Sequence, residues 1–116
     1  MKAKWFRFNR KQEEARRLVW DQVLYTEKLL PAKVLERMFT PFKDNYAYGW
    51  VVRTESNRKV IGHGGGINGF STMIVRIPQD RLFAAALSNL ETRDAGRIAS
   101  ELAWLALGEK VEAPAR

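Results

Sequence analysis

Residues 60–70 have the sequence Val-Ile-Gly-His-Gly-Gly-Gly-Ile-Asn-Gly-Phe, which is the densest signal in the chain. Two β-branched residues begin it, and five of the eight residues at 62–69 are glycine. Glycine lets other backbone or ligand atoms approach closely, so a glycine-rich strand can offer its N–H groups to a ligand. The only histidine of the chain, His63, lies among these glycines. We therefore expect a strand here that carries functional residues.

Apolar segments separated by turn residues surround this stretch, which indicates an antiparallel meander. Strands are expected at 46–53, from Val60 into the glycine-rich stretch, at 71–77 and at 82–88. The polar residues 54–59 are turn-like, and Pro78-Gln79-Asp80-Arg81 is a hairpin turn. The strand at 82–88 is apolar except at its end, which suits a strand buried on both faces.

Helices are expected on both sides of the meander. The first covers 11–28, and a short second helix follows Pro31 and ends at Pro41. A third covers 93–107, with Gly108 as its stop. The residues expected to line its buried side are Ala95, Ile98, Ala99, Leu102, Leu105 and Ala106. The fold class is α+β: N-terminal helices, an antiparallel β-meander of three to four strands, and a C-terminal helix packed on the sheet.

Composition limits the classes of protein and of site. The chain has 116 residues, 46% hydrophobic and 28% charged, which fits one globular domain. It has no cysteine, so thiol nucleophiles, disulfides and thiolate metal sites are excluded. No cofactor or metal is expected. No apolar run approaches the roughly 18 residues of a membrane span, and no signal-peptide pattern follows the basic N-terminus. The cellular location is left open.

Basic residues concentrate at the N-terminus. Residues 1–17 contain seven basic and two acidic side chains, whereas the remainder contains 13 basic and 11 acidic ones. We expect a basic arm at 1–17, a domain at 18–110 and a tail at 111–116. With Trp5, Phe6 and Phe8 interleaved, the arm could contact nucleic acid or an anionic membrane, although a solvated leader explains it better.

The glycine-rich stretch is also open to other interpretations. A phosphate-binding loop would need a Gly-Lys-Ser/Thr ending before a helix, and a strand is expected here instead. His63 could be no more than a residue of a turn.

Several short motifs, in their order and spacing, resemble the serine beta-lactamase, penicillin-binding-protein and esterase superfamily. They are Tyr48-Gly49-Trp50, the segment from Gly62 to Phe70, Ile77-Pro78-Gln79-Asp80 and Leu87-Ser88-Asn89. Upstream, Trp20-Asp21-Gln22, Leu29-Leu30 and Met38-Phe39-Thr40-Pro41 are also similar to that family. The resemblance extends over about 18–108 and implies a partial beta-lactamase-like fold.

The family uses three motifs: Ser-x-x-Lys, Tyr-x-Asn or Ser-x-Asn, and Lys-Thr-Gly or His-x-Gly. His63-Gly64-Gly65 matches the third. The resemblance implies that His63 orients substrate or supports proton transfer, that Gly65 leaves room for it, and that the Gly66 amide forms half of an oxyanion hole. Gly64 departs from the usual hydroxyl residue, which slightly favours ester or peptide substrates over beta-lactams.

The other two motifs are missing. No Tyr-x-Asn or Ser-x-Asn occurs, and the one Ser-x-x-Lys, Ser56 to Lys59, lies in an expected turn and not on a helix. We therefore expect a C-terminal fragment of a serine hydrolase that is inactive alone. Its partner would be the missing N-terminal half of the fold or a second copy of the chain. The alternatives are a non-catalytic binding module on the same scaffold, or a polyanion binder that uses the basic arm.

Overall fold

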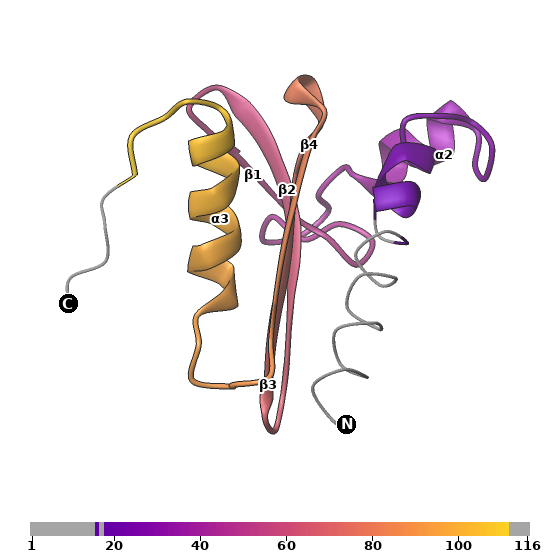
Figure 1. Ribbon diagram of the computed structural model, residues 1–116. Coiled ribbons are helices and arrows are strands. Elements are labelled where there is room, and N and C mark those ends of the chain that lie inside the picture. Colours follow the sequence, from indigo (N-terminus) through magenta and orange to yellow (C-terminus); the bar gives the residue numbers. More distant parts are fainter. Residues whose placement is uncertain (1–15, 17, 112–116) are drawn as a thin grey trace. The chain divides into compact units, whose positions relative to one another are not determined.

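The computed structural model describes residues 16 and 18–111 and contains helices and one antiparallel sheet (Figure 1). The chain divides into two compact units, Met1–Met38 and Phe39–Arg116. The described part of the first unit contains helices joined by turns and bends, and the second unit holds the sheet and the C-terminal helix α3. The expected α+β class is confirmed. Apart from Arg16 and Val111, the expected basic arm and tail lie outside the described residues.

The first helix is shorter at its C-terminal end than expected. Among the described residues it comprises 16 and 18–23, and 24–30 form turns and bends, so the expected helix at 24–28 is wrong. The amides of Tyr25 and Thr26 donate to the carbonyls of Gln22 and Val23, three residues back, which tightens the last turn. The Thr26 hydroxyl also donates to the Val23 carbonyl at 2.8 Å, so the side chain competes with continuation of the helix.

The second helix, α2, spans Ala32–Met38, as expected between Pro31 and Pro41. The Pro31 carbonyl accepts from the amides of Val34 and Leu35 at 2.9 and 3.1 Å. Proline is therefore well placed here, because the N–H that it lacks would have no partner within the helix.

The expected strand at 46–53 is wrong in its first half, since β1 spans only Val51–Glu55. Gly49 has a φ of 76°, and the Ala47 amide donates to the Trp50 carbonyl at 2.7 Å, so the chain turns here. The alternating aromatic residues contact other rings instead of lining one strand. Tyr48 lies 5.5 Å from Phe42, and Trp50 lies 5.7 Å from Phe39, between ring centroids.

The meander is confirmed and has four strands in the order β1-β2-β3-β4, all antiparallel. Strand β2 spans Arg58–Ile67, β3 Phe70–Ile77 and β4 Leu82–Ser88. The first hairpin turns at Ser56 and Asn57, whose φ angles of 47° and 60° match a two-residue turn with positive φ at both positions. A short 3₁₀ helix, η1 (Pro78–Asp80), forms the expected last turn.

Helix α3 spans Ala95–Ala106 and packs on one face of the sheet (Figure 1). The Asp94 carboxylate accepts from the Arg97 amide at 2.8 Å and caps the N-terminus. At the other end Gly108, with a φ of 81°, donates to the Leu105 carbonyl, and Glu109 donates to the Trp104 carbonyl. This is the Schellman arrangement expected of a glycine stop.

The buried side of α3 differs from the expected one. Its buried residues are Ala95, Ala99 and Ala103, at a spacing of four, whereas Ile98, Leu102 and Leu105 are 37–55% exposed. The alanines pack in the core against buried residues of β2, β3 and β4, namely Val60, Val75, Ile77 and Ala86. Small side chains at i, i+4 and i+8 let the helix approach the sheet closely, which the larger residues would prevent.

Strand β4 is not buried on both faces. Ala86 is its only buried residue, and the others are half-buried. Among the described strands β4 pairs only with β3, so it lies at an edge of the sheet, where fewer neighbours cover it.

The pairing of β2 with β3 leaves no room for a side chain at Gly62. A Cβ atom there would lie 2.7 Å from the Ile74 carbonyl oxygen, whereas at Gly64 the nearest atom would be Met73 Sδ at 3.5 Å. We predict that Gly62→Ala lowers the free energy of unfolding by about 1–3 kcal/mol. Gly64→Ala, the matched control, should change it by less than about 0.5 kcal/mol. Urea unfolding measures both, and equal losses would contradict the close approach at Gly62.

The cap of α3 gives a second prediction. Asp94→Ala removes the acceptor of the Arg97 amide and should cost about 1 kcal/mol of unfolding free energy. Asp94→Asn keeps an acceptor oxygen and should retain most of the stability. Thermal unfolding followed by circular dichroism tests the pair. If Asn is as destabilising as Ala, the cap does not act through this hydrogen bond.

Candidate functional site

The glycine-rich stretch forms the second half of β2 and extends beyond β1. The register pairs Val51 of β1 with Gly62, so among the described strands residues 63–67 pair only with β3. In an antiparallel ladder alternate residues turn their N–H and C=O groups away from the paired strand. The free edge of this segment therefore presents backbone donors and acceptors. A ligand that binds through the Gly66 amide would need such an edge.

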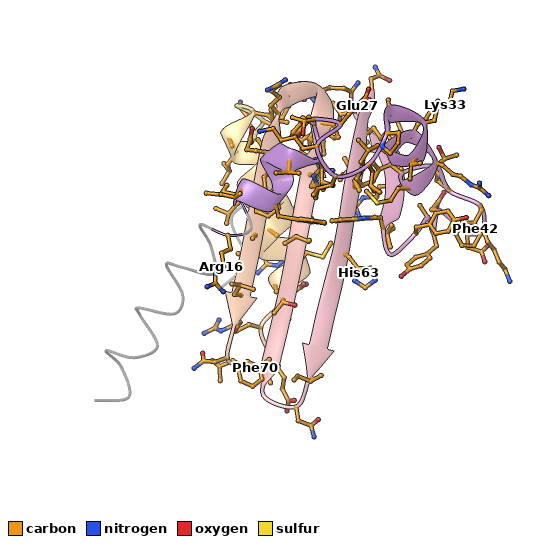
Figure 2. All side chains as sticks on the ribbon, turned by 90° about the vertical axis from the view of Figure 1, so that its right-hand side faces the viewer. Arg16, Glu27, Lys33, Phe42, His63 and Phe70 are labelled. Carbon is orange, nitrogen blue, oxygen red and sulfur yellow. The ribbon has the colours of Figure 1, made fainter. Side chains whose placement is uncertain are left out.

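His63 lies on the face of the sheet opposite α3. Side chains alternate along a strand, and Val60, three residues earlier, belongs to the core beneath α3. Figure 2 shows His63 on the side of the sheet that faces the viewer, with α3 behind the strands. His63 is solvent-exposed and is paired across the sheet with Ile74. The expectation of a strand residue is thus confirmed, and the alternative of a turn residue is wrong.

Both ring nitrogens of His63 have polar neighbours. Its Nε2 lies 3.2 Å from the hydroxyl oxygen of Tyr46, and its Nδ1 lies 2.6 Å from the carbonyl oxygen of Gly64. The Tyr46 ring also meets the imidazole edge-on, with ring centroids 6.0 Å apart. Sequence reasoning missed Tyr46, because a turn, and not continuation of β1, brings it to His63 from 17 residues away.

Gly65 lies opposite Thr72 of β3. A Cβ atom at Gly65 would lie 2.7 Å from Thr72 Oγ1, and this hydroxyl donates to the Gly65 carbonyl at 3.1 Å. The space beside Gly65 is therefore partly filled by a hydroxyl group. The sequence carried no signal for Thr72, since its pairing depends on the register of β2 with β3.

Gly66 has more space than Gly65. The nearest atom to a Cβ placed there would be the Phe70 carbonyl oxygen at 4.0 Å. The adjacent hairpin turn at Gly69, with a φ of 84°, is joined to the segment after β4, because the Gly69 amide donates to the Glu91 carboxylate at 2.9 Å.

Ser56 lies far from His63. It is in the turn between β1 and β2, and Lys59 is a strand residue, so the two are not on a helix. His63 lies five positions after Arg58 in β2, which corresponds to about 17 Å. The positions of Ser56 and Lys59 therefore agree with the expectation that they do not form a nucleophile motif.

Arg76 is a buried charged residue on the face that carries His63. It is paired with Ile61 of β2, is 2% exposed, and has its guanidinium carbon 5.1 Å from the centroid of the Phe39 ring. A cation over an aromatic face is stabilised by the ring quadrupole. The sequence analysis did not single out Arg76, although a charge inside an apolar strand is an unusual feature.

The titratable side chains of this face do not form a metal site. Among the residues that the structure describes, no group of three or more His, Asp or Glu side chains could hold a metal ion. The same residues include no helix long and apolar enough to cross a membrane.

The contact between Gly65 and Thr72 is directly testable. We predict that Gly65→Ala lowers the free energy of unfolding by about 1–3 kcal/mol because its Cβ meets the Thr72 hydroxyl. Thr72→Ala alone should cost about 1 kcal/mol through its lost hydrogen bond. The double variant should be more stable than the sum of the two losses implies. Additive effects in urea unfolding of this double-mutant cycle would refute the contact.

Comparison with known proteins identifies a family. The family model described as Beta-lactamase matches residues 5–108. Penicillin-binding protein 4* of Bacillus subtilis (strain 168) is 32% identical over 79 residues, which is 62% of this chain and 18% of that protein. The chain thus spans about a fifth of the length of this curated relative. Because the family model covers most of the chain, the chain belongs to the Beta-lactamase family.

Proposed function

We propose that this chain supplies one wall of a serine-hydrolase active site, formed by His63, Gly65 and Gly66. The observation that carries the proposal is the course of β2. Its His63-Gly64-Gly65-Gly66 segment extends past the end of β1 and displays His63 on the exposed face opposite α3. A wall of this kind needs a free strand edge and a side chain directed away from the core, and this segment has both.

The proposed chemistry is acyl transfer to a serine followed by hydrolysis of an ester, amide or beta-lactam. Negative charge develops on the attacked carbonyl oxygen, and a fixed N–H donor stabilises it more in the transition state than in the substrate. The Gly66 amide is the proposed donor and forms half of an oxyanion hole. One such donor contributes about 10²–10³-fold in kcat in known hydrolases. His63 orients the substrate, and Gly65 leaves room for the substrate because it has no Cβ atom.

The nucleophile and its base would come from outside this sequence. The Ser56 to Lys59 segment comprises the turn between β1 and β2 and the first residues of β2, and Arg58 lies about 17 Å along the strand from His63. The family membership supports a hydrolase with its Ser-x-x-Lys and Tyr-x-Asn elements in another segment. The free edge of β4, which is apolar from Leu82 to Leu87, is the proposed place where the rest of the fold pairs.

An active-site probe tests the missing nucleophile. We predict that the chain alone forms no covalent adduct with a fluorophosphonate or a penicillin in intact-mass analysis, and does not turn over a simple ester. Ser56→Ala serves as the control. An adduct with the chain that disappears in Ser56→Ala would overturn the proposal, because Ser56 would then be the activated residue.

Supplying the missing part tests the wall. The chain is mixed with the segment of a family member that carries Ser-x-x-Lys and Tyr-x-Asn. The proposal expects ester hydrolysis to appear and His63→Ala to reduce it. A complex that forms without hydrolysis would favour a non-catalytic binding module on this scaffold. Pairing of the chain with a second copy, seen as a dimer in sedimentation, would assign the β4 edge to self-association.

A further inference from the structure

His63 has no unoccupied ring nitrogen in this structure. One nitrogen, Nδ1, lies 2.6 Å from the Gly64 carbonyl oxygen, and the other, Nε2, lies 3.2 Å from the Tyr46 hydroxyl oxygen. Both distances are within hydrogen-bonding range. The two neighbours differ in chemistry, since a carbonyl oxygen only accepts a hydrogen bond while a hydroxyl both donates and accepts.

This difference determines the tautomer of the neutral ring. Because the Gly64 carbonyl only accepts, Nδ1 must carry the proton and donate it. A neutral imidazole with a proton on Nδ1 has a lone pair on Nε2. The Tyr46 hydroxyl must therefore donate to Nε2. The carbonyl thus selects the tautomer, and the tyrosine hydroxyl, which can donate or accept, adapts to it by donating to Nε2.

The backbone around Tyr46 holds its hydroxyl in place. The Tyr46 amide donates to the Lys43 carbonyl at 2.7 Å, and the Tyr46 carbonyl accepts from the Phe42 amide at 3.1 Å. The neighbouring Asn45 carbonyl accepts from the amide of Val52 in β1 at 2.8 Å, which attaches this loop to the sheet. The residue is thus anchored on both sides, and its ring meets the imidazole edge-on.

We propose that Tyr46 is a positioning residue of this wall, which donates to Nε2 of the Nδ1–H tautomer of His63 and so occupies its lone pair. The functional part of this inference rests on the function proposed above. While the pair is intact, neutral His63 has no lone pair available to accept a proton from a substrate. The group that a substrate meets beside the imidazole is then the Tyr46 hydroxyl oxygen, whose lone pairs remain available as acceptors.

The single histidine makes this inference directly measurable. A ¹H–¹⁵N long-range correlation spectrum of the chain contains one imidazole, that of His63. In the spectrum of the neutral ring, we expect Nδ1 to show the shift of a protonated nitrogen and Nε2 that of an unprotonated one. A free imidazole side chain favours the opposite tautomer, so the expected spectrum is distinctive.

Tyr46→Phe removes the donor, and Tyr48→Phe is the matched control. Tyr48 lies two residues away in the same loop, and its ring contacts Phe42. We expect Tyr46→Phe to change the ¹⁵N shift of Nε2, because its lone pair loses the hydroxyl donor, while Nδ1 stays protonated on the Gly64 carbonyl. Tyr48→Phe should leave the Nε2 shift unchanged. Backbone amide spectra of both variants show whether the fold is retained.

The outcomes separate this inference from the proposed function. An Nε2–H tautomer in the unmodified chain would overturn the inference even if Tyr46→Phe failed to fold, and so would equal effects of the two variants. The measurement needs no catalysis. If the chain shows the expected tautomer but forms no active hydrolase with the missing part, only the proposed function is refuted. In a completed hydrolase, the inference expects Tyr46→Phe to reduce turnover more than Tyr48→Phe does.

Discussion

The close approach of β2 and β3 at Gly62 determines where His63, Gly65 and Gly66, the residues of the proposed wall, lie on the sheet. A Cβ atom at this position would lie 2.7 Å from the Ile74 carbonyl oxygen, so the two backbones can pair at this distance only if residue 62 has no side chain. The pairing then places His63 opposite Ile74 and Gly65 opposite Thr72. A slip of one residue would turn His63 into the core beneath α3, because side chains alternate between the two faces.

The packing of α3 follows a related principle on the other face. Three alanines at intervals of four residues contact the sheet, and the larger apolar residues of the helix, Ile98, Leu102 and Leu105, remain largely exposed. A helix that buries alanines gains close contact but removes little apolar surface from water. The edge strand β4 likewise leaves most of its apolar side chains only half-buried. Both features agree with the proposal that a further part of a hydrolase packs against this chain.

The sequence predicted those elements in which local signals and tertiary structure agree. Strand β4 and helix α3 were expected close to their observed bounds, because turn residues and Gly108 delimit them. The prediction failed where a single residue changed the path of the chain. Gly49 turned an alternating aromatic segment out of the sheet, and the hydroxyl of Thr26 replaced a turn of helix. The expected buried side of α3 was right at Ala95 and Ala99 but wrong at the larger residues, because periodicity does not distinguish alanines that pack closely from larger residues that face outward.

The partners of the site residues were beyond sequence reasoning for a different reason. His63, Gly65 and Gly66 were chosen from a motif within one strand, whereas Tyr46 and Thr72 reach that strand through a loop and a hairpin. All five residues belong to the unit Phe39–Arg116, so the contacts that orient His63 and fill the space at Gly65 are internal to it. Fixed donors and acceptors are effective in catalysis because they need no reorganisation during the reaction. The proposed wall, whose hydrogen bonds form within one unit, meets that condition before the remainder of an active site is added.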